Sequence, residues 1–152
     1  MSKEYAHITV AVDLTEESAR VIQKGQRIAE RTGAILDVVH TLEPVGVTYG
    51  GDMSMDVDTL QQELETHARQ GLTRLANELG ISEEHQHVLV GQPDVSIKEF
   101  TEQHQTDLIV VGSHGRTGLA LMLGSTTSTV LRDANCDVLA VKVSNVAEEP
   151  FD

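Results

Sequence analysis

Residues 107–118, DLIVVGSHGRTG, consist of a short apolar run followed by a glycine-rich turn, and this segment is the most informative about the fold. The four residues from Leu108 to Val111 are all apolar rather than alternating, which is typical of a strand buried on both faces of a parallel sheet. Similar runs occur at His7–Asp13 (HITVAVD) and Asp137–Val143 (DVLAVKV). The three runs together predict an α/β fold built on a parallel sheet.

Segments with helical spacing separate these runs. In chain order, the other expected elements are a helix that Thr15 caps and Gly33 ends, a strand at Ala34–Thr41, a loop at Glu43–Val57, a helix from Asp58 to Gly80, a strand at His87–Val90, a helix from Asp94 as its cap to His104, and a helix at Ser125–Asp133. Strands that alternate with helices imply right-handed crossovers and helices on both faces of the sheet. Five strands fit the order 3-2-1-4-5 or 2-1-3-4-5, and periodicity does not choose between them. Strand 5 is an edge in both.

Length and charge limit the class of protein. A chain of 152 residues fits a single domain over 1–152, with an acidic tail at 144–152. The formal charge of −13 repels nucleic acid and anionic lipid, so we expect neither as a partner. The single cysteine, Cys136, excludes an intrachain disulfide, and no apolar run approaches the roughly 20 residues that span a bilayer. We therefore expect a cytoplasmic protein without membrane insertion.

A ligand crevice is expected at the carboxyl ends of the strands, because ligands of open parallel sheets bind where the strand order reverses. For the order 3-2-1-4-5 this point lies between strands 1 and 4. Asp13 ends the first strand run, and Gly112, Gly115 and Gly118 follow the fourth. Closely spaced glycines let backbone amides approach and surround an anion, although they also serve simply to turn a chain.

A second cluster, Gly124-Ser125-Thr126-Thr127, precedes the last expected helix, where free amides and hydroxyls favour a phosphate. The chain lacks the G-x-x-x-x-G-K-[ST] pattern, and Arg116 is the only basic residue of the loop. The first strand does not lead into G-x-G-x-x-G either. A phosphate site of this chain would therefore differ from a P-loop and from the common dinucleotide fingerprint.

The segments HITVAVD and DLIVVGSHGRTGLALMLGSTTSTVLRDANCDVLAVKV resemble the universal stress protein family, and the resemblance covers nearly the whole chain. It implies an open five-stranded parallel sheet of order 3-2-1-4-5, Rossmann-like and similar to the adenine nucleotide alpha hydrolases. It further implies a stress-response protein that binds ATP, with Mg²⁺ accompanying the nucleotide. Other members of the family bind no nucleotide.

Carried over by position, the resemblance implies a nucleotide site with a base side and a phosphate side. The base and ribose side comprises Ala11, Val12, Asp13 and Thr41, and the phosphate side comprises Gly112, Ser113, His114, Gly115, Arg116, Gly124, Ser125, Thr126 and Thr127. One departure is that eight residues, Arg116 to Leu123, replace the family's nine. The deletion shifts Gly124 relative to Gly115 by a few ångströms at most. Nucleotide binding either survives in altered geometry or is lost.

Several single residues also allow interpretations other than nucleotide binding, catalysis or metal binding. Asp13 is also suited to capping the turn after its strand. His114 has no carboxylate near it in sequence, so we assign no catalytic residue. His85 and His87 could face one way on a strand, but without a third ligand in view we expect surface histidines and no protein metal site. Cys136 fits a small buried packing residue.

The apolar edge strand at Asp137–Val143 predicts a homodimer, because pairing with its own copy covers unpaired backbone groups. The resemblance implies dimers through the same strand. Lys142 argues against pairing, because lysines on edge strands hinder association. The sequence thus favours a homodimeric nucleotide-binding module rather than an enzyme. The alternative is a dimeric interaction protein of the same family without nucleotide. Slow ATP hydrolysis is disfavoured because Leu14-Thr15-Glu16 lacks the Ser-Gly-Gly turn of related ATP-splitting domains.

Overall fold

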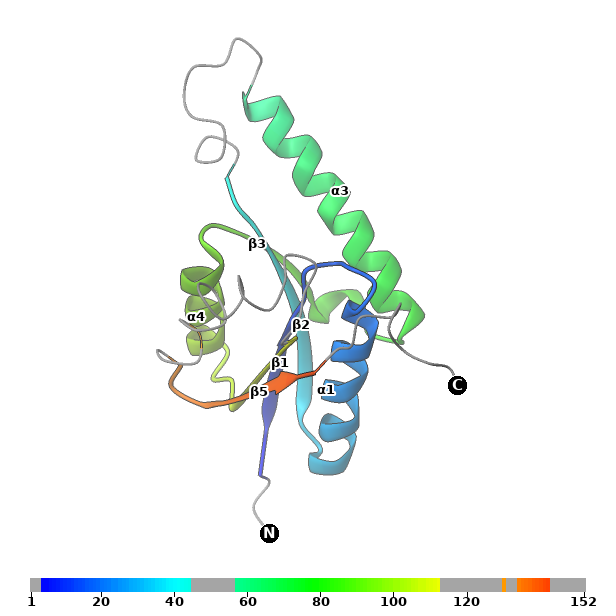
Figure 1. Ribbon diagram of the computed structural model, residues 1–152, viewed down its shortest axis with the longest axis vertical. Helices are drawn as coiled ribbons and strands as arrows, with labels where there is room; N and C mark the ends of the chain where they lie inside the picture. Colours follow the sequence, from blue (N-terminus) through cyan, green and yellow to red (C-terminus); the bar gives the residue numbers. More distant parts are fainter. Residues whose placement is uncertain (1–3, 45–56, 113–129, 131–133, 143–152) are drawn as a thin grey trace.

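The computed structural model describes residues 4–44, 57–112, 130 and 134–142, which form a parallel sheet with helices on both faces (Figure 1). The elements in chain order are β1 (His7–Ala11), α1 (Ser18–Thr32), β2 (Ile35–Leu42), α3 (Val57–Glu78), the 3₁₀ turn η1 (Glu83–His85), β3 (Gln86–Val90), α4 (Pro93–Gln103), β4 (Leu108–Gly112) and β5 (Asp137–Val141). No described helix is both long enough and apolar enough to cross a membrane.

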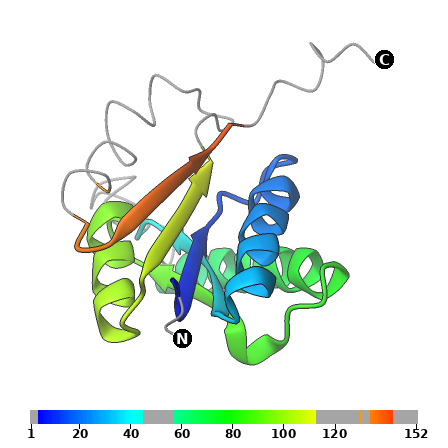
Figure 2. The same ribbon diagram turned by 90° about the horizontal axis from the view of Figure 1, so that it is seen from below.

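The sheet has the order β3-β2-β1-β4-β5, and all four pairings are parallel. This order confirms the predicted strand order 3-2-1-4-5 and excludes the alternative order 2-1-3-4-5. β1 is central, with Val10 opposite Val38 of β2 on one side and opposite Val110 of β4 on the other. Figure 2 shows β5 at one edge of the sheet and β1 inside it.

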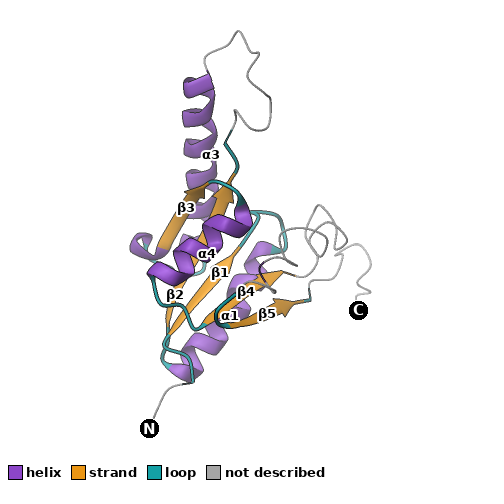
Figure 3. Cartoon of the chain, turned by 90° about the vertical axis from the view of Figure 1, so that its left-hand side faces the viewer, coloured by secondary structure: helices purple, strands orange, loops and turns teal. Residues whose placement is uncertain are grey.

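The helices lie on both faces of the sheet, with α4 on one face and α1 and α3 on the other (Figure 3). An apolar cluster on each face holds them against the strands. On one face, Ile22 of α1 and Leu72 of α3 pack with Val10 in the larger buried cluster. On the other face, Ile97 of α4 packs with Ile109 of β4, together with the buried Val130. Strands covered on both faces explain the uninterrupted apolar runs in the sequence.

Gly25 sets how closely α1 approaches the sheet. A β-carbon at this position would lie 2.7 Å from Cγ2 of Val10 and 3.3 Å from Cδ1 of Leu36. Both atoms belong to the packed interior and have little room to move. The glycine therefore lets α1 lie directly against β1 and β2.

The predicted end of the first helix at Gly33 is confirmed, and two predicted helix starts are wrong. Gly33 ends α1 with a φ of 80°, and its N–H donates to the carbonyl of Ala29. Thr15 does not cap α1, because the chain first makes a turn through residues 13–17 and the helix begins at Ser18. Asp94 does not cap α4 but lies in its first turn behind Pro93, whose ring is pre-organised for the first helical position.

Some predicted elements fall outside the described residues. They are the centre of the loop (45–56), most of the last helix (125–129 and 131–133) and the acidic tail (144–152). Val130, expected to face inward from that helix, is buried.

Candidate functional site

The carboxyl ends of β1, β2 and β4 form one edge of the sheet. Ala11 is opposite Val39, and Val10 is opposite Val110, so the segments after β1 and β4 leave the sheet on the same side. Gly112 ends β4 at this edge, and a β-carbon there would lie 3.3 Å from Cγ2 of Val21. The reversal of strand order between β1 and β4 is the place where ligands of such sheets bind.

Asp13 is held in position by the turn that follows β1. Its Oδ1 accepts hydrogen bonds from the Thr15 N–H (3.1 Å), the Thr15 hydroxyl (2.7 Å) and the Ser18 hydroxyl (3.2 Å). These bonds confirm that Asp13 organises the turn. Within the described part of the chain, Oδ2 has no hydrogen-bond donor, and the residue is exposed. The carboxylate is thus oriented by one oxygen and presents the other.

The backbone of Val12 is fixed between β1 and β2. Its N–H donates to the Val39 carbonyl at 2.9 Å, and its carbonyl lies 2.9 Å from Nδ1 of His40. Because a carbonyl only accepts, His40 carries a proton on Nδ1. Sequence reasoning missed His40, since a histidine inside the apolar run of β2 gives no signal that its ring reaches the neighbouring strand.

Thr41 extends the same register. Thr41 lies two residues beyond Val39, which is opposite Ala11, and Leu89 of β3 pairs with Thr41 on the other side. Its hydroxyl oxygen is buried and has no hydrogen-bond partner among the described residues. A buried hydroxyl without a partner costs about 1–3 kcal/mol. Among the described residues, nothing offsets this cost for the Thr41 hydroxyl.

The structure brings together five of the predicted site residues at one edge, namely Ala11, Val12, Asp13, Thr41 and Gly112. The other eight lie outside the described residues: Ser113, His114, Gly115, Arg116, Gly124, Ser125, Thr126 and Thr127. The residues predicted for the base and ribose side are thus all described, whereas Gly112 is the one described residue of the predicted phosphate side. That any of these residues binds a nucleotide stays a prediction.

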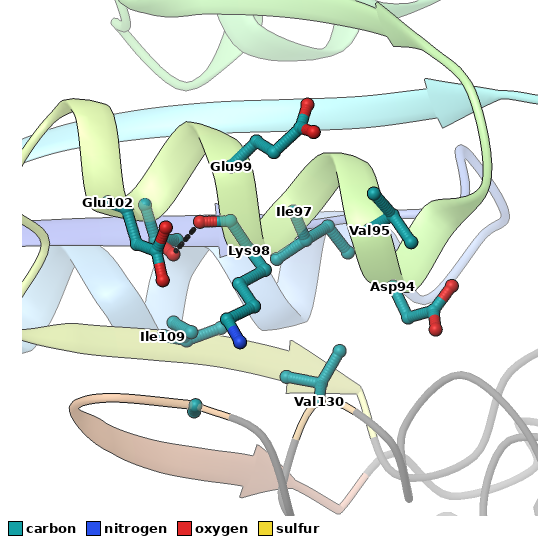
Figure 4. Close-up of a pocket in the computed structure, with 10 residues that line it drawn as sticks. Asp94, Val95, Ile97, Lys98, Glu99, Glu102, Ile109 and Val130 are labelled. Carbon is teal, nitrogen blue, oxygen red and sulfur yellow. Dashed lines mark hydrogen bonds between the residues drawn. The ribbon is translucent and has the colours of Figure 1, made fainter.

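A separate cavity of about 320 Å³ lies between α4 and β4 (Figure 4). Ile97, Ile109 and Val130 form its apolar part, and Thr101 donates to the Lys98 carbonyl at its side. Its described lining includes three carboxylates, from Asp94, Glu99 and Glu102, but one cation, from Lys98. This charge is unsuited to phosphate, and none of the predicted site residues is in that lining.

Cys136 packs beside the cluster of Ile97, Ile109 and Val111, as its packing interpretation predicted. Burial raises the pKa of its thiol, and the charges of Asp137 and Asp107 raise it further. A thiol that is mostly protonated is a poor nucleophile and metal ligand. The packing of Cys136 and its raised thiol pKa thus both favour a packing role.

Three comparisons with known proteins agree on the family. Residues 4–142 match the family model described as the universal stress protein family. Universal stress protein A homolog 1 of Coxiella burnetii is 42% identical over 138 residues, which cover 90% of this chain and 96% of that protein.

Solved structures of universal stress proteins share the fold. The protein from Lactobacillus plantarum is 26% identical, with a TM-score of 0.67 over 90% of this chain and 97% of its own. The protein from Archaeoglobus fulgidus, solved in complex with dAMP, is 27% identical, with a TM-score of 0.59 over 91% of this chain and 98% of its own. The sequence match, the strand order and these structures lead to one conclusion: this chain belongs to the universal stress protein family.

Proposed function

We propose that this chain is a cytoplasmic stress-response module that binds ATP or another adenine nucleotide at the carboxyl edge of β1, β2 and β4. We further propose that it is one domain over 1–152, works as a homodimer and acts by binding rather than by catalysis. The relative from Archaeoglobus fulgidus, which is 27% identical, was solved in complex with dAMP, an adenine nucleotide. This supports the class of ligand.

One observation carries the proposal: the buried hydroxyl of Thr41, two residues beyond the Ala11–Val39 pair on β2, lacks a partner among the described residues. A nucleotide base presents polar edge atoms, and one of these would supply a hydrogen bond to the hydroxyl. Asp13 offers Oδ2 to a ribose hydroxyl, since Oδ1 is already saturated by three donors. The side chains available at this edge thus fit the base and ribose side of a nucleotide.

The triphosphate would be held by the glycine-rich segment that begins at Gly112 and by the cluster at Gly124–Thr127. Backbone amides and hydroxyls are the donors that these residue types supply. Mg²⁺ would accompany the phosphates. Among the described residues, no group of three or more His, Cys, Asp or Glu side chains is arranged to hold a metal ion.

A dimeric interaction protein without nucleotide is the competing function. The loop that is one residue shorter than the family pattern favours it, whereas the retained glycines and the unsatisfied hydroxyl of Thr41 favour binding.

Titration calorimetry of the full chain with ATP and Mg²⁺ separates the two functions. We expect saturable binding to the wild type, weaker binding of GTP, and no release of ADP over hours. Heat no greater than dilution for ATP and for dAMP would leave the interaction protein as the function. Steady ADP release would instead make the protein an enzyme.

The homodimer is proposed through β5, which ends the sheet and carries the exposed Ala140. An edge strand exposes N–H and C=O groups that a second copy can pair with across a two-fold axis. Pairing of this kind leaves the carboxyl edge of β1 and β2 open to the nucleotide.

A further inference from the structure

A buried carboxylate lies among histidines near the amino ends of the strands, away from the nucleotide edge. Asp37 of β2 is 4% exposed. Its Oδ2 contacts Nε2 of His7 from β1, and its Oδ1 lies 2.8 Å from Nε2 of His87 and 3.0 Å from Nδ1 of His85. The four side chains, called the Asp37 cluster below, join β1, β2, η1 and β3.

Sequence reasoning treated His85 and His87 as surface histidines, and this was wrong. His85 is in η1 rather than in a strand, and both rings are half-buried because they turn inward to Asp37. Aspartate and histidines that lie 30 to 50 positions apart gave no common pattern in the sequence.

The hydrogen bonds of the cluster require an extra proton. Nδ1 of His7 lies 2.6 Å from the carbonyl oxygen of His104, and a carbonyl has no proton to give, so Nδ1 must carry one. Each of the three contacts between a ring nitrogen and Asp37 needs a proton as well. Four hydrogen bonds thus need four protons, whereas three neutral imidazoles and an ionised carboxylate hold only three.

We propose that the Asp37 cluster is a proton-binding site, which in the folded protein keeps one proton more than its neutral histidines supply, held between His7 and Asp37. This proton completes the hydrogen bonds that tie β1 to β2 and to the end of α4. The site is unrelated to the nucleotide edge and does not depend on the proposed function.

The electrostatics place the proton on the His7 ring rather than on the carboxylate. Burial raises the pKa of Asp37, but the hydrogen bonds from His87, His7 and His85 outweigh it and hold that pKa well below its usual range. An ionised Asp37 leaves His7 as an imidazolium. A buried ion pair of this kind persists when its remaining donors are satisfied, as Nδ1 of His7 is by the His104 carbonyl.

The other charged and titratable groups around the cluster come from every neighbouring element. Glu84 of η1 is 3.5 Å from Nε2 of His85, and Asp107, just before β4, accepts the backbone N–H of His7 at 3.1 Å. The His104 ring stacks on Phe100 at 3.9 Å and meets the His7 ring edge-on at 5.8 Å. These contacts add the carboxylates of Glu84 and Asp107 and include no Lys or Arg. Nearby negative charge favours a positive charge that stays on the cluster.

The retained proton makes stability depend on pH with a definite sign. An unfolded histidine loses its charge near pH 6.5, so above that pH the folded chain binds more protons than the unfolded chain. Stability that rests on this proton is complete below about pH 6.5 and is lost as the pH rises. One proton corresponds to an unfolding constant that rises at most about tenfold per pH unit.

The first test is chemical unfolding of the full chain between about pH 7 and 9, compared with Asp37→Asn. Asparagine is uncharged and can donate to a neutral His7 ring, so it removes the need for the extra proton. We expect the unfolding constant of the wild type to rise more steeply with pH than that of Asp37→Asn. His67→Gln, which removes an exposed histidine of α3, is the matched control and should keep the wild-type slope.

The second test does not require a variant to fold. Nitrogen-15 NMR of the histidine rings at pH 8 should show His7 protonated on both nitrogens. A neutral His7 ring at pH 8 would overturn the proposal. So would equal pH slopes for the wild type and a folded Asp37→Asn.

Discussion

The Tyr5 hydroxyl donates a hydrogen bond of 2.8 Å to Oδ2 of Asp137, across 132 positions of sequence. It joins the residue two places before β1 to the first residue of β5, although β4 lies between these strands. Nearby, Asp107 accepts the backbone N–H groups of Ala6 (2.6 Å) and His7 (3.1 Å). Carboxylates at the amino ends of β4 and β5 thus secure the start of the chain.

This relationship predicts an alkaline effect. The hydrogen bond to Asp137 raises the pKa of Tyr5 to about 12, and burial and the Asp137 charge add to it. Because the neutral phenol is the donor, its contribution is complete below about pH 10 and is lost as the pH rises toward the folded value. Tyr5→Phe should cost about 0.5–1 kcal/mol at pH 8, measured by urea unfolding, and less at pH 11. An equal cost at both pH values would show that packing, not the hydroxyl, stabilises this end.

The close approach of α1 predicts opposite results for two glycines. Gly25→Ala should destabilise by about 1–3 kcal/mol, because its β-carbon would overlap Val10 in a packed core. Gly71→Ala in α3 is the control, since its β-carbon would meet only Leu14 at an ordinary 3.6 Å. That substitution should stabilise by about 0.5–1 kcal/mol through helix propensity. Thermal unfolding checks both, and a stabilising Gly25→Ala contradicts the packing described.

The unpartnered hydroxyl predicts two effects of opposite sign. Thr41→Val should stabilise the ligand-free protein by about 1 kcal/mol, because it removes a buried polar group that has no partner among the described residues, and should weaken ATP binding several-fold. Thr9→Val is the matched control, since the Thr9 hydroxyl is 2.7 Å from that of Thr106 and its loss leaves Thr106 unpaired. It should destabilise by about 1–2 kcal/mol and leave affinity unchanged. Unchanged affinity in Thr41→Val would remove Thr41 from the site.

The edge strand predicts where the subunits meet. Ala140→Lys should convert the dimer to a monomer in sedimentation experiments, because a two-fold axis brings the two new charges close together. Val90→Lys adds the same charge at the opposite edge of the sheet, where Val90 is 46% exposed, and should leave the dimer intact. Dissociation by Val90→Lys alone would move the interface to β3.

The sequence predicted the fold because burial on both faces of a parallel sheet leaves continuous apolar runs, as in β4, and glycines mark helix ends, as Gly33 does. It could not place the start of α1, because Thr15 competes with a turn that Asp13 organises through side-chain hydrogen bonds. The position of Asp13 just after the first strand could be predicted from the order of the elements along the chain. The contacts of His40 and of the Asp37 cluster could not be predicted from the sequence. These contacts join neighbouring strands, and hydrophobic periodicity does not specify the register between strands.

Amide chemical shifts during titration with ATP and Mg²⁺ report the location of the ligand most directly. We expect saturable shifts at Val12, Asp13, Thr41 and Gly112, with little change around Asp37 at the other end of the strands. Shifts confined to the α4 cavity around Ile97, or none at any ATP concentration, would contradict a nucleotide site at the carboxyl edge of β1, β2 and β4.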